Sequence, residues 1–234
     1  MSTTAAASPS RAHAPTAVAG SLALLLAAGT VLAVGSAPRQ TTVLALVVLG
    51  VVCLGARNTP REQGRATEWL LVGAGLLLFT IAAWSVATAP LTRLDTAVLL
   101  PGTVGVAVLG LGLVPVAHEH SEMVATVGAA LVFVAVLVAG VAQLADRTIL
   151  LAATVGVVAA WDGARSATTL SRQVGRAADT VVAEAVHVGA TLATGLVVVA
   201  LAETVWRVGA TGLPLTGLLL FLGAALALLA YLYS

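Results

Sequence analysis

The residues best suited to chemistry are the His and Glu side chains of one short polar segment. His118-Glu119-His120-Ser121-Glu122 carries two imidazoles and two carboxylates, all of them possible metal ligands. No further group of ligands accompanies the segment in the sequence, so a solvated turn between two helices is the stronger interpretation and a metal site the weaker one. We therefore expect no metal and no cofactor.

Two acid–base pairs lie at the ends of one apolar segment. Glu184 and His187 are three residues apart, a spacing that would suit a proton relay, but we favour an interfacial pair whose side chains reach water. Glu203 and Arg207 are four residues apart, which is typical of an ion pair within one helix. Both pairs are predicted to be structural.

Enzyme signatures are absent from the sequence. The motifs of P-loop nucleotidases, zinc proteases and serine hydrolases do not occur, and no Asp lies within an expected membrane span to serve an intramembrane aspartyl protease. Thr103-Val104-Gly105 matches the start of the potassium filter TVGYG, which needs an unwound pore loop. Here the surrounding run is continuously apolar, so a packing helix with Pro101 and close-packed glycines is favoured. We predict no enzymatic activity.

The composition identifies the class of protein that must position these residues. The chain has 234 residues, 59% of them hydrophobic and 9% charged, with a mean hydropathy of +1.06. Soluble chains are about 25% charged, so the soluble class is excluded. The net charge is +1 and the basic residues are scattered, which argues against nucleic-acid binding. Cys53 is the single cysteine, so no internal disulfide can form.

The apolar segments predict an all-α, polytopic helical membrane protein. A span needs roughly 20 apolar residues, and helices are favoured over barrel strands because the segments are apolar on every side rather than alternating. The sixth segment is short unless its helix continues past Asp162. Eight candidate transmembrane helices occupy residues 15–37, 41–56, 69–88, 96–117, 123–145, 148–161, 185–206 and 214–233.

The arginines predict the orientation in the membrane, because positive charge beside a span is retained in the cytoplasm. With the N-terminus inside, the inner side holds Arg11, Arg57, Arg61, Arg65, Arg165, Arg172 and Arg176, and the outer side holds Arg39, Arg93, Arg147 and Arg207. Both termini are therefore expected in the cytoplasm of a multi-pass cell-membrane protein. Residues 1–14 would be a disordered cytoplasmic tail and residues 15–234 a single transmembrane domain. A cleaved signal peptide is the disfavoured alternative for the first segment.

An internal repeat is also visible. Residues 61–66 and 172–177 share the pattern Arg-x-x-Gly-Arg-Ala, and each copy precedes the third span of a four-span half. Two parallel four-helix halves would follow, an arrangement known in membrane proteins. The alternative is coincidence in a chain rich in Arg, Gly and Ala.

Residues 162–184 form the longest stretch between expected spans. On a helix, Leu170, Val174, Ala177 and Val181 make one apolar stripe, and Arg165, Arg172 and Arg176 line the opposite side. This pattern predicts an amphipathic cytoplasmic helix between spans six and seven, with the three arginines as partner-docking candidates. The alternative is a helical extension of spans six and seven that covers the bundle.

The same region carries a resemblance. The runs AWDGAR at 160–165, LSRQVGR at 170–176 and AEAVHVGA at 183–190 resemble a family of uncharacterised multi-pass membrane proteins of halophilic archaea. That resemblance implies a family without assigned activity, whose members are often encoded beside AAA-type ATPases of the MoxR class. It implies no catalytic or binding residues.

We therefore expect an uncharacterised structural, assembly or partner-docking protein that works with a cytoplasmic ATPase system. A small-solute or ion transporter is the alternative, with thin support from the fourth span and from Thr191 and Thr194. The lipid bilayer is the expected environment, and the sequence gives no oligomeric state.

Overall fold

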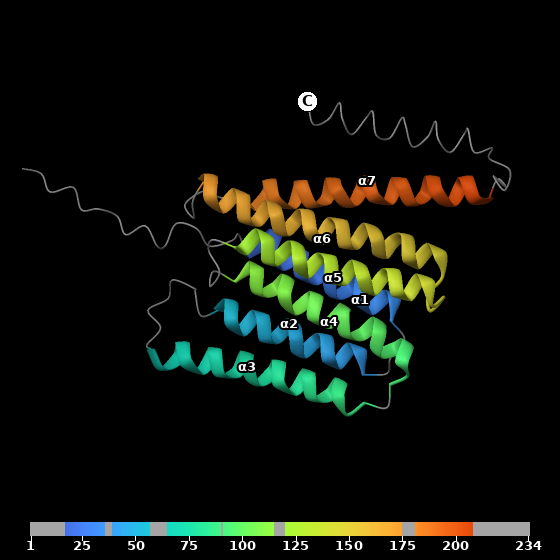
Figure 1. Cartoon of the computed structure of the whole chain (residues 1–234). Helices are drawn as coiled ribbons and strands as arrows, with labels where there is room; N and C mark the ends of the chain where they lie inside the picture. The colour runs from blue at the N-terminus through green and yellow to red at the C-terminus, as the bar shows by residue number, and fades with distance from the viewer. Residues whose placement is uncertain are drawn as a thin grey trace, which may run out of the picture. The chain divides into compact units, whose positions relative to one another are not determined.

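The protein is all-helical in the part of the chain that the structure describes, a computed structural model covering residues 17–35, 39–56, 65–89, 91–114, 120–174 and 181–207 (Figure 1). Its helices are α1 (Ala17–Val34), α2 (Gln40–Ala56), α3 (Arg65–Ala87), α4 (Arg93–Leu113), α5 (Ser121–Val141), α6 (Arg147–Val174) and α7 (Val181–Arg207). The predicted tail at 1–14 and the predicted eighth span at 214–233 lie outside the described residues.

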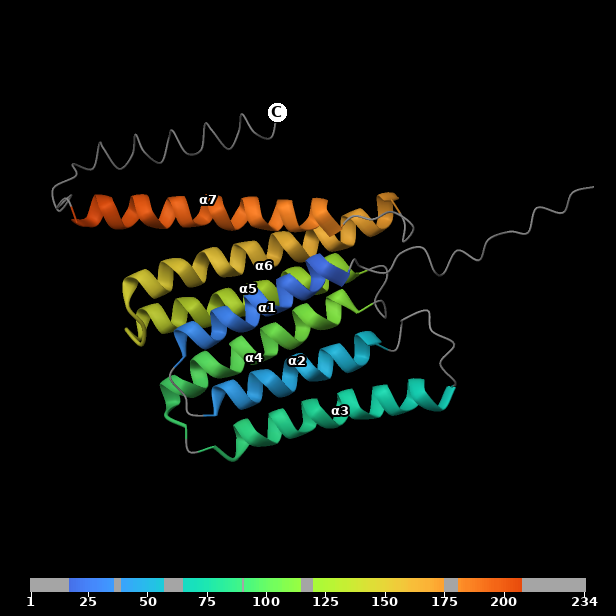
Figure 2. The ribbon, with the colours of Figure 1, turned by 180° about the vertical axis from the view of Figure 1, so that it is seen from behind.

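The chain divides into two compact units, Met1–Leu196 and Val197–Ser234. The first unit contains α1 to α6 and the first part of α7. Within it, helices that follow one another along the chain run in opposite directions, so α1, α3, α5 and α7 begin at one common end (Figures 1 and 2). Of the second unit, the structure describes the last turns of α7, which end at Arg207.

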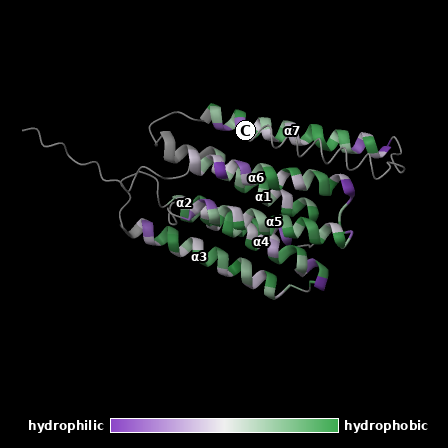
Figure 3. Cartoon of the chain, turned by 45° about the horizontal axis from the view of Figure 1, so that its top comes forward, coloured by the Kyte–Doolittle hydropathy of each residue, from purple (hydrophilic) through white to green (hydrophobic). Residues whose placement is uncertain are grey.

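Five helices are long and apolar enough to cross a membrane: Thr67–Ala87, Arg93–Leu113, Ser121–Val141, Arg147–Thr169 and Val182–Arg207. Two further apolar helices, Ala19–Val34 and Gln40–Ala56, are shorter. Hydrophobic residues line most of the length of these helices, and strongly hydrophilic ones lie mostly near helix ends (Figure 3). Backbone groups in lipid must be hydrogen-bonded within the chain, which helices achieve. The helices thus indicate a membrane protein.

The sixth helix differs from its predicted boundaries. The sequence predicts a short span at 148–161, whereas α6 is one helix of 28 residues that continues through Asp162 and Arg165. Residues 162–174 are therefore the second half of α6 rather than a separate helix, which matches the alternative of a helical extension. The prediction ended the span at the first charged residue, although α5 and α7 supply partners for both charged side chains.

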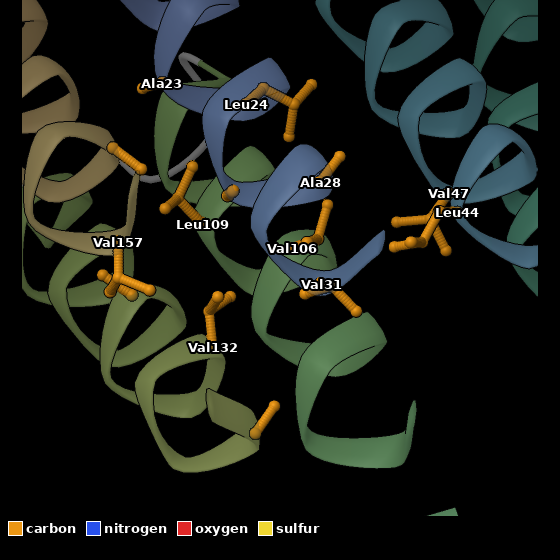
Figure 4. Packing of buried hydrophobic residues seen from close by; sticks show 14 of the residues in the cluster. Ala23, Leu24, Ala28, Val31, Leu44, Val47, Val106, Leu109, Val132 and Val157 are labelled. Atoms are coloured by element: carbon orange, nitrogen blue, oxygen red, sulfur yellow. The ribbon is translucent and has the colours of Figure 1, made fainter. Parts of the chain in front are cut away.

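The core of the first unit lies around α1. This helix packs along α6 and also contacts α4, α5 and α2, while α4 packs along α5 and α2 along α3. Val31, Val106, Leu109 and Val132 are completely buried where α1, α4 and α5 meet (Figure 4). Small and β-branched side chains dominate this core, so neighbouring backbones lie close together.

Glycines form the contact between α4 and α5. A Cβ added to Gly105 would lie 2.7 Å from the backbone nitrogen of Val132, and one added to Gly112 would lie 2.6 Å from that of Ala125. A Cβ on Gly128 would meet the backbone nitrogen of Leu109. The predicted close-packed helix is confirmed, and residues 103–106 are helical rather than part of an unwound filter.

Two further packing features that the sequence suggests, a small-residue seam on α7 and a repeat of two halves, are not seen among the described residues. Gly189 and Ala193 are spaced like a helix-packing seam, but both are exposed, and a Cβ on Gly189 would meet nothing within 4 Å. A repeat of two parallel halves would make α5 contact α2 as α1 contacts α6, yet α1 packs extensively on α6 and α5 does not pack on α2. The described packing therefore does not reproduce the repeat.

A capping box begins α4. The backbone nitrogen of Asp95 donates to the Thr92 hydroxyl at 3.1 Å, and the backbone nitrogen of Thr92 donates to the Asp95 carboxylate at 3.3 Å. These bonds satisfy two of the four backbone donors that a helix N-terminus leaves without a partner inside the helix. Thr92 therefore fixes where α4 starts.

Replacing Thr92 by alanine is expected to reduce the free energy of unfolding by about 1 kcal/mol, the usual cost of a lost N-cap. Serine at this position keeps the hydroxyl and should restore most of the loss. Thermal unfolding in detergent measures both variants. Equal destabilisation by Thr92→Ala and Thr92→Ser would contradict a role for the hydroxyl.

The connections between helices are held by local hydrogen bonds. After α5, the backbone nitrogens of Leu144 and Gln143 donate to the carbonyls of Ala139 and Gly140 at 2.9 and 3.1 Å, a Schellman motif. Gln143 takes the left-handed conformation, with φ of 54°, that glycine usually occupies there. At the start of α2, the buried side-chain amide of Gln40 donates to the carbonyl of Val31 near the end of α1.

Candidate functional site

Ionisable side chains from several helices meet at the end where α1, α5 and α7 begin and α6 finishes. The contacts with the clearest chemical character join Asp162 of α6 to His187 and Thr191 of α7. We name these three residues the α6–α7 site. Arg165, Glu122 and Glu184 lie on the adjoining turns of α6, α5 and α7.

One carboxylate oxygen organises the α6–α7 site. Asp162 Oδ2 accepts a hydrogen bond of 2.7 Å from the Thr191 hydroxyl and lies 3.0 Å from Nε2 of His187. The Thr191 hydroxyl also lies 3.2 Å from the backbone carbonyl of His187. The side chains of Asp162 and His187 are 31% and 51% exposed, so the pair is shielded on one side and open on the other.

The site lies some way inside the candidate spans. Asp162 is seven residues before Thr169, where the span of α6 ends, and His187 is five residues after Val182, where the span of α7 begins. At about 1.5 Å per residue, Asp162 is on the order of 10 Å from the span end. Ionisable groups at such depth are costly unless they are paired, and they are typical of proton or ion pathways.

Arg165 belongs to a contact between α5 and α6. Its Nε lies 3.2 Å from a carboxylate oxygen of Glu122, and its guanidinium carbon lies 5.7 Å from the centre of the Trp161 ring. The Trp161 indole in turn donates to the Thr126 hydroxyl at 3.2 Å. Arg165 therefore links α5 to α6, and its side chain is half exposed.

Glu184 is buried against the start of α1. One of its carboxylate oxygens accepts a hydrogen bond of 2.9 Å from the backbone nitrogen of Ala19, and the residue is only 1% exposed. The first backbone N–H groups of a helix lack partners within the helix and attract negative charge. Glu184 thus caps α1 from α7, and its side chain is buried among the helices rather than reaching water as predicted.

Glu184 and His187 were expected to pair with each other, but in the structure each contacts a different helix. Glu184 reaches α1, whereas His187 reaches Asp162 on α6. The prediction considered one helix alone, where a spacing of three places both side chains on one side. It missed Asp162, which also contradicts the expectation that no Asp lies within a span. The sequence feature that could have identified this residue is its place directly between Trp161 and Gly163, at the end of an apolar segment.

The geometry does not suit nucleophilic catalysis. In a hydroxyl–imidazole–carboxylate triad, the imidazole lies between the other two groups and removes the hydroxyl proton. Here Thr191 and His187 both face the carboxylate of Asp162. The arrangement can hold a proton or orient an imidazole, but it does not activate the hydroxyl.

The polar segment 118–122, for which the sequence favours a solvated turn over a metal site, is described only from His120 onward. Among the described residues no group of three or more potential ligands occurs. His120 is exposed at the start of α5 and makes no side-chain capping bond, while Glu122 pairs with Arg165. His118 and Glu119 lie outside the described residues, as do the side chains of the docking candidates Arg172 and Arg176.

At the far end of α7, Glu203 and Arg207 form the predicted ion pair within one helix. Arg207 Nε lies 3.9 Å from a carboxylate oxygen of Glu203, and the side chains of Arg207 and Glu203 are 81% and 14% exposed. Ion pairs four residues apart on one helix contribute about 0.2–0.5 kcal/mol to stability. This pair carries no sign of a functional site.

A cavity of about 340 Å³ lies between α2, α3 and α4. Thr103 is the one lining residue with a polar side chain, and its hydroxyl donates to the carbonyl of Leu99 at 2.7 Å. The cavity therefore offers an apolar surface without free polar groups from its lining side chains.

Comparison with known proteins gives a family but no activity. The chain matches no curated protein and no solved structure. The profile of a family described as Family of unknown function (DUF7519) matches residues 73–229, which is more than half of the chain. The matched range includes α4, α5, α6 and α7, and thus every residue of the α6–α7 site. The chain belongs to this family of unknown function, DUF7519.

Proposed function

We propose that this chain is a multi-pass protein of the cell membrane with both termini in the cytoplasm, and that it serves a structural or assembly role by docking a cytoplasmic partner. The partner would belong to an AAA-type ATPase system, and the chain itself would not be an enzyme. The observation that carries the proposal is the length of α6. This helix continues to Val174, five residues past the apolar span that ends at Thr169.

Two of the docking candidates, Arg172 and Arg176, lie beyond the apolar span of α6. Arg172 lies on it, and Arg176 follows two residues after its last helical residue. Arg165, the third docking candidate, is partly engaged by Glu122. Arginine suits docking because its guanidinium forms paired hydrogen bonds with carboxylates. Arg172 and Arg176 are therefore the stronger candidates for contact with a partner.

The rest of the described chain supports a structural role. The core contains closely packed apolar side chains, and the cavity between α2, α3 and α4 lacks polar groups suited to a substrate. Large apolar side chains on α3 are exposed, among them Trp69, Leu77 and Trp84. Such surfaces are stable in lipid or against other helices.

Transport of an ion is the second candidate. Its support is the α6–α7 site, which combines a carboxylate, an imidazole and a hydroxyl inside two candidate spans. Intramembrane ionisable groups commonly mark ion or proton pathways. Proton or ion flux into liposomes containing the purified protein, abolished by Asp162→Asn, would favour transport over docking.

Affinity capture from mild detergent tests the docking proposal. The double variant Arg172→Gln/Arg176→Gln should reduce recovery of an ATPase partner about tenfold, which corresponds to about 1.4 kcal/mol of binding free energy. The matched control is Arg39→Gln/Arg93→Gln, which removes two exposed arginines from the opposite end. Glutamine is preferred to glutamate because added negative charge would introduce repulsion. Equal recovery from both double variants would refute docking.

The orientation is checked in the same variants, because arginines also influence topology. Single cysteines replace Thr41 or Met123, two exposed residues at opposite ends, in a chain whose Cys53 is changed to serine. An impermeant maleimide should label the cysteine at 41 in intact cells and leave the cysteine at 123 unlabelled. The reverse pattern would overturn the proposed orientation. Gln40 is unsuitable for this purpose because its side chain is buried.

A further inference from the structure

The contact between α6 and α7 contains a hydrogen-bonding arrangement in which one carboxylate faces an imidazole and a hydroxyl. We propose that Asp162, His187 and Thr191 form a proton-binding site, and that loading this site with a proton strengthens the hold of α6 on the first half of α7. The inference does not depend on the docking function, because it concerns a contact within the first unit.

The position of the imidazole hydrogen follows from the distances. Asp162 Oδ2 lies 3.0 Å from Nε2 of His187 and accepts the Thr191 hydroxyl hydrogen at 2.7 Å. A carboxylate only accepts hydrogen bonds, so Nε2 must carry a hydrogen in this arrangement. In the neutral imidazole, Nδ1 is then the free acceptor. A proton taken from water forms an N–H bond at Nδ1, and Nε2–H remains on Asp162.

Proton uptake changes the strength of the contact. The neutral imidazole donates a hydrogen bond in which only the carboxylate is charged, whereas the imidazolium adds the attraction between two opposite charges. The His187 side chain is 51% exposed, so it is not enclosed by the neighbouring helices. The Thr191 hydroxyl supports the carboxylate in both states. One proton therefore converts the link between α6 and α7 from a hydrogen bond with one charged partner to an ion pair.

The described charged groups on the turns adjoining the site have partners of their own. On α6, Arg165 is paired with Glu122 of α5 at 3.2 Å. On α7, Glu184 accepts a hydrogen bond from the start of α1 at 2.9 Å. The described residues of α1, 17–34, contain no ionisable side chain. Among the described residues, the Glu184 carboxylate on the adjoining turn of α7 is a further charge, and it also attracts an imidazolium.

The strengthened contact with Asp162 is expected to matter for α7 because this helix has few other contacts with the rest of the first unit. Only 6% of its apolar span is buried. Apolar contact with the rest of the first unit includes Val188, which is buried near Gly163, and Gly195, which lies against Val155. Few buried contacts mean a low free energy of local opening. A single strengthened polar contact then changes the fraction of time that the helix spends detached.

Hydrogen exchange of the full-length protein in detergent tests the proposal. Measurements at about pH 5.5 and about pH 7.5 lie on either side of the range in which histidines titrate. After correction for intrinsic exchange, peptides from residues 181–196 should be about threefold better protected at the lower pH. Asp162→Asn and His187→Gln should each abolish this difference, and the control Glu203→Gln should retain it. A wild-type protein without the difference, or an Asp162→Asn variant that keeps it, would overturn the proposal.

Nitrogen NMR of ¹⁵N-histidine-labelled wild type provides a test that does not depend on whether the variants fold. The His187 signal should show the neutral Nε2–H tautomer at the higher pH and protonation of both nitrogens at the lower pH. Observation of the Nδ1–H tautomer, or of an unchanged signal at both pH values, would refute the assigned hydrogen positions.

Discussion

Replacing Gly128 by alanine is expected to reduce the free energy of unfolding by about 2–3 kcal/mol, the upper part of the usual range for overpacking. The added Cβ would meet the backbone nitrogen of Leu109, and it would lie 2.6 Å from the Leu109 Cα. A backbone cannot rotate away as a flexible side chain can. Leu109 is also fully buried, so α4 and α5 would have to separate and open the core between them.

Gly29→Ala is the matched control for this substitution. Gly29 is a helical glycine of α1, and a Cβ there would meet nothing within 4 Å. Replacing glycine by alanine in a helix raises helix propensity by the same amount in both variants, roughly 0.5–1 kcal/mol. The difference between their free energies of unfolding therefore measures the cost of the close contact between Gly128 and Leu109. Denaturant-induced unfolding in detergent measures both. If the two variants shift stability equally, Gly128 is not a close contact.

The second large effect is expected at Glu184. Replacement by alanine removes the acceptor for the backbone N–H of Ala19 and leaves that buried donor without its bond of 2.9 Å. An unsatisfied buried donor costs about 1–3 kcal/mol, and hydrogen bonds to charged groups lie at the upper end. We expect Glu184→Ala to lower stability by about 2 kcal/mol and to increase exchange of the first turn of α1.

Two companion variants separate the hydrogen bond from other effects of changing Glu184. Glu184→Gln keeps a carbonyl oxygen that can accept from Ala19, so it should recover about half of the loss. Glu203→Gln removes a carboxylate from an ion pair between neighbouring turns of the same helix, where it faces an exposed arginine, and should cost less than about 1 kcal/mol. An alanine variant as stable as Glu203→Gln would show that the contact with α1 contributes little.

The helical fold could be predicted because long apolar segments admit few structures in lipid. The boundary of α6 could not be predicted in the same way. Sequence reading ended the span near Asp162 because an isolated charge is costly in an apolar environment. The carboxylate is instead satisfied by His187 and Thr191, which lie more than twenty residues further along the chain. Such pairing depends on tertiary structure, which hydropathy does not describe.

The site residues show the same limit. The spacing of Glu184 and His187 revealed their common side of α7, but not that α1 and α6 would supply their partners. The spacing of small residues was equally ambiguous. It marked a real contact at Gly105 and Gly112, whereas Gly189 has the same character and meets no neighbour within 4 Å. Residue spacing shows which side chains share one side of a helix, whereas the helix that contacts that side is known only from the tertiary structure.

The family match agrees with part of the resemblance seen in the sequence. Both indicate a family without an assigned function, and the match at 73–229 covers the region 160–190 where the resemblance is sharpest. The connection to halophilic archaea and to ATPase gene neighbours remains a prediction. The α6–α7 site lies inside the matched region, which makes it a natural first target for experiments on this family.

The unequal helix lengths have a consequence for the surrounding lipid. At about 1.5 Å per residue, the 23-residue span of α6 extends about 35 Å and the 17 residues of α2 about 26 Å. A hydrocarbon layer is about 30 Å thick. In a bilayer the longer span would therefore tilt or raise the local thickness, and a shorter helix such as α2, were it to cross, would draw the headgroups inward. The bilayer around such helices would be uneven, and the stability of the protein should then depend on the acyl-chain length of the host lipid.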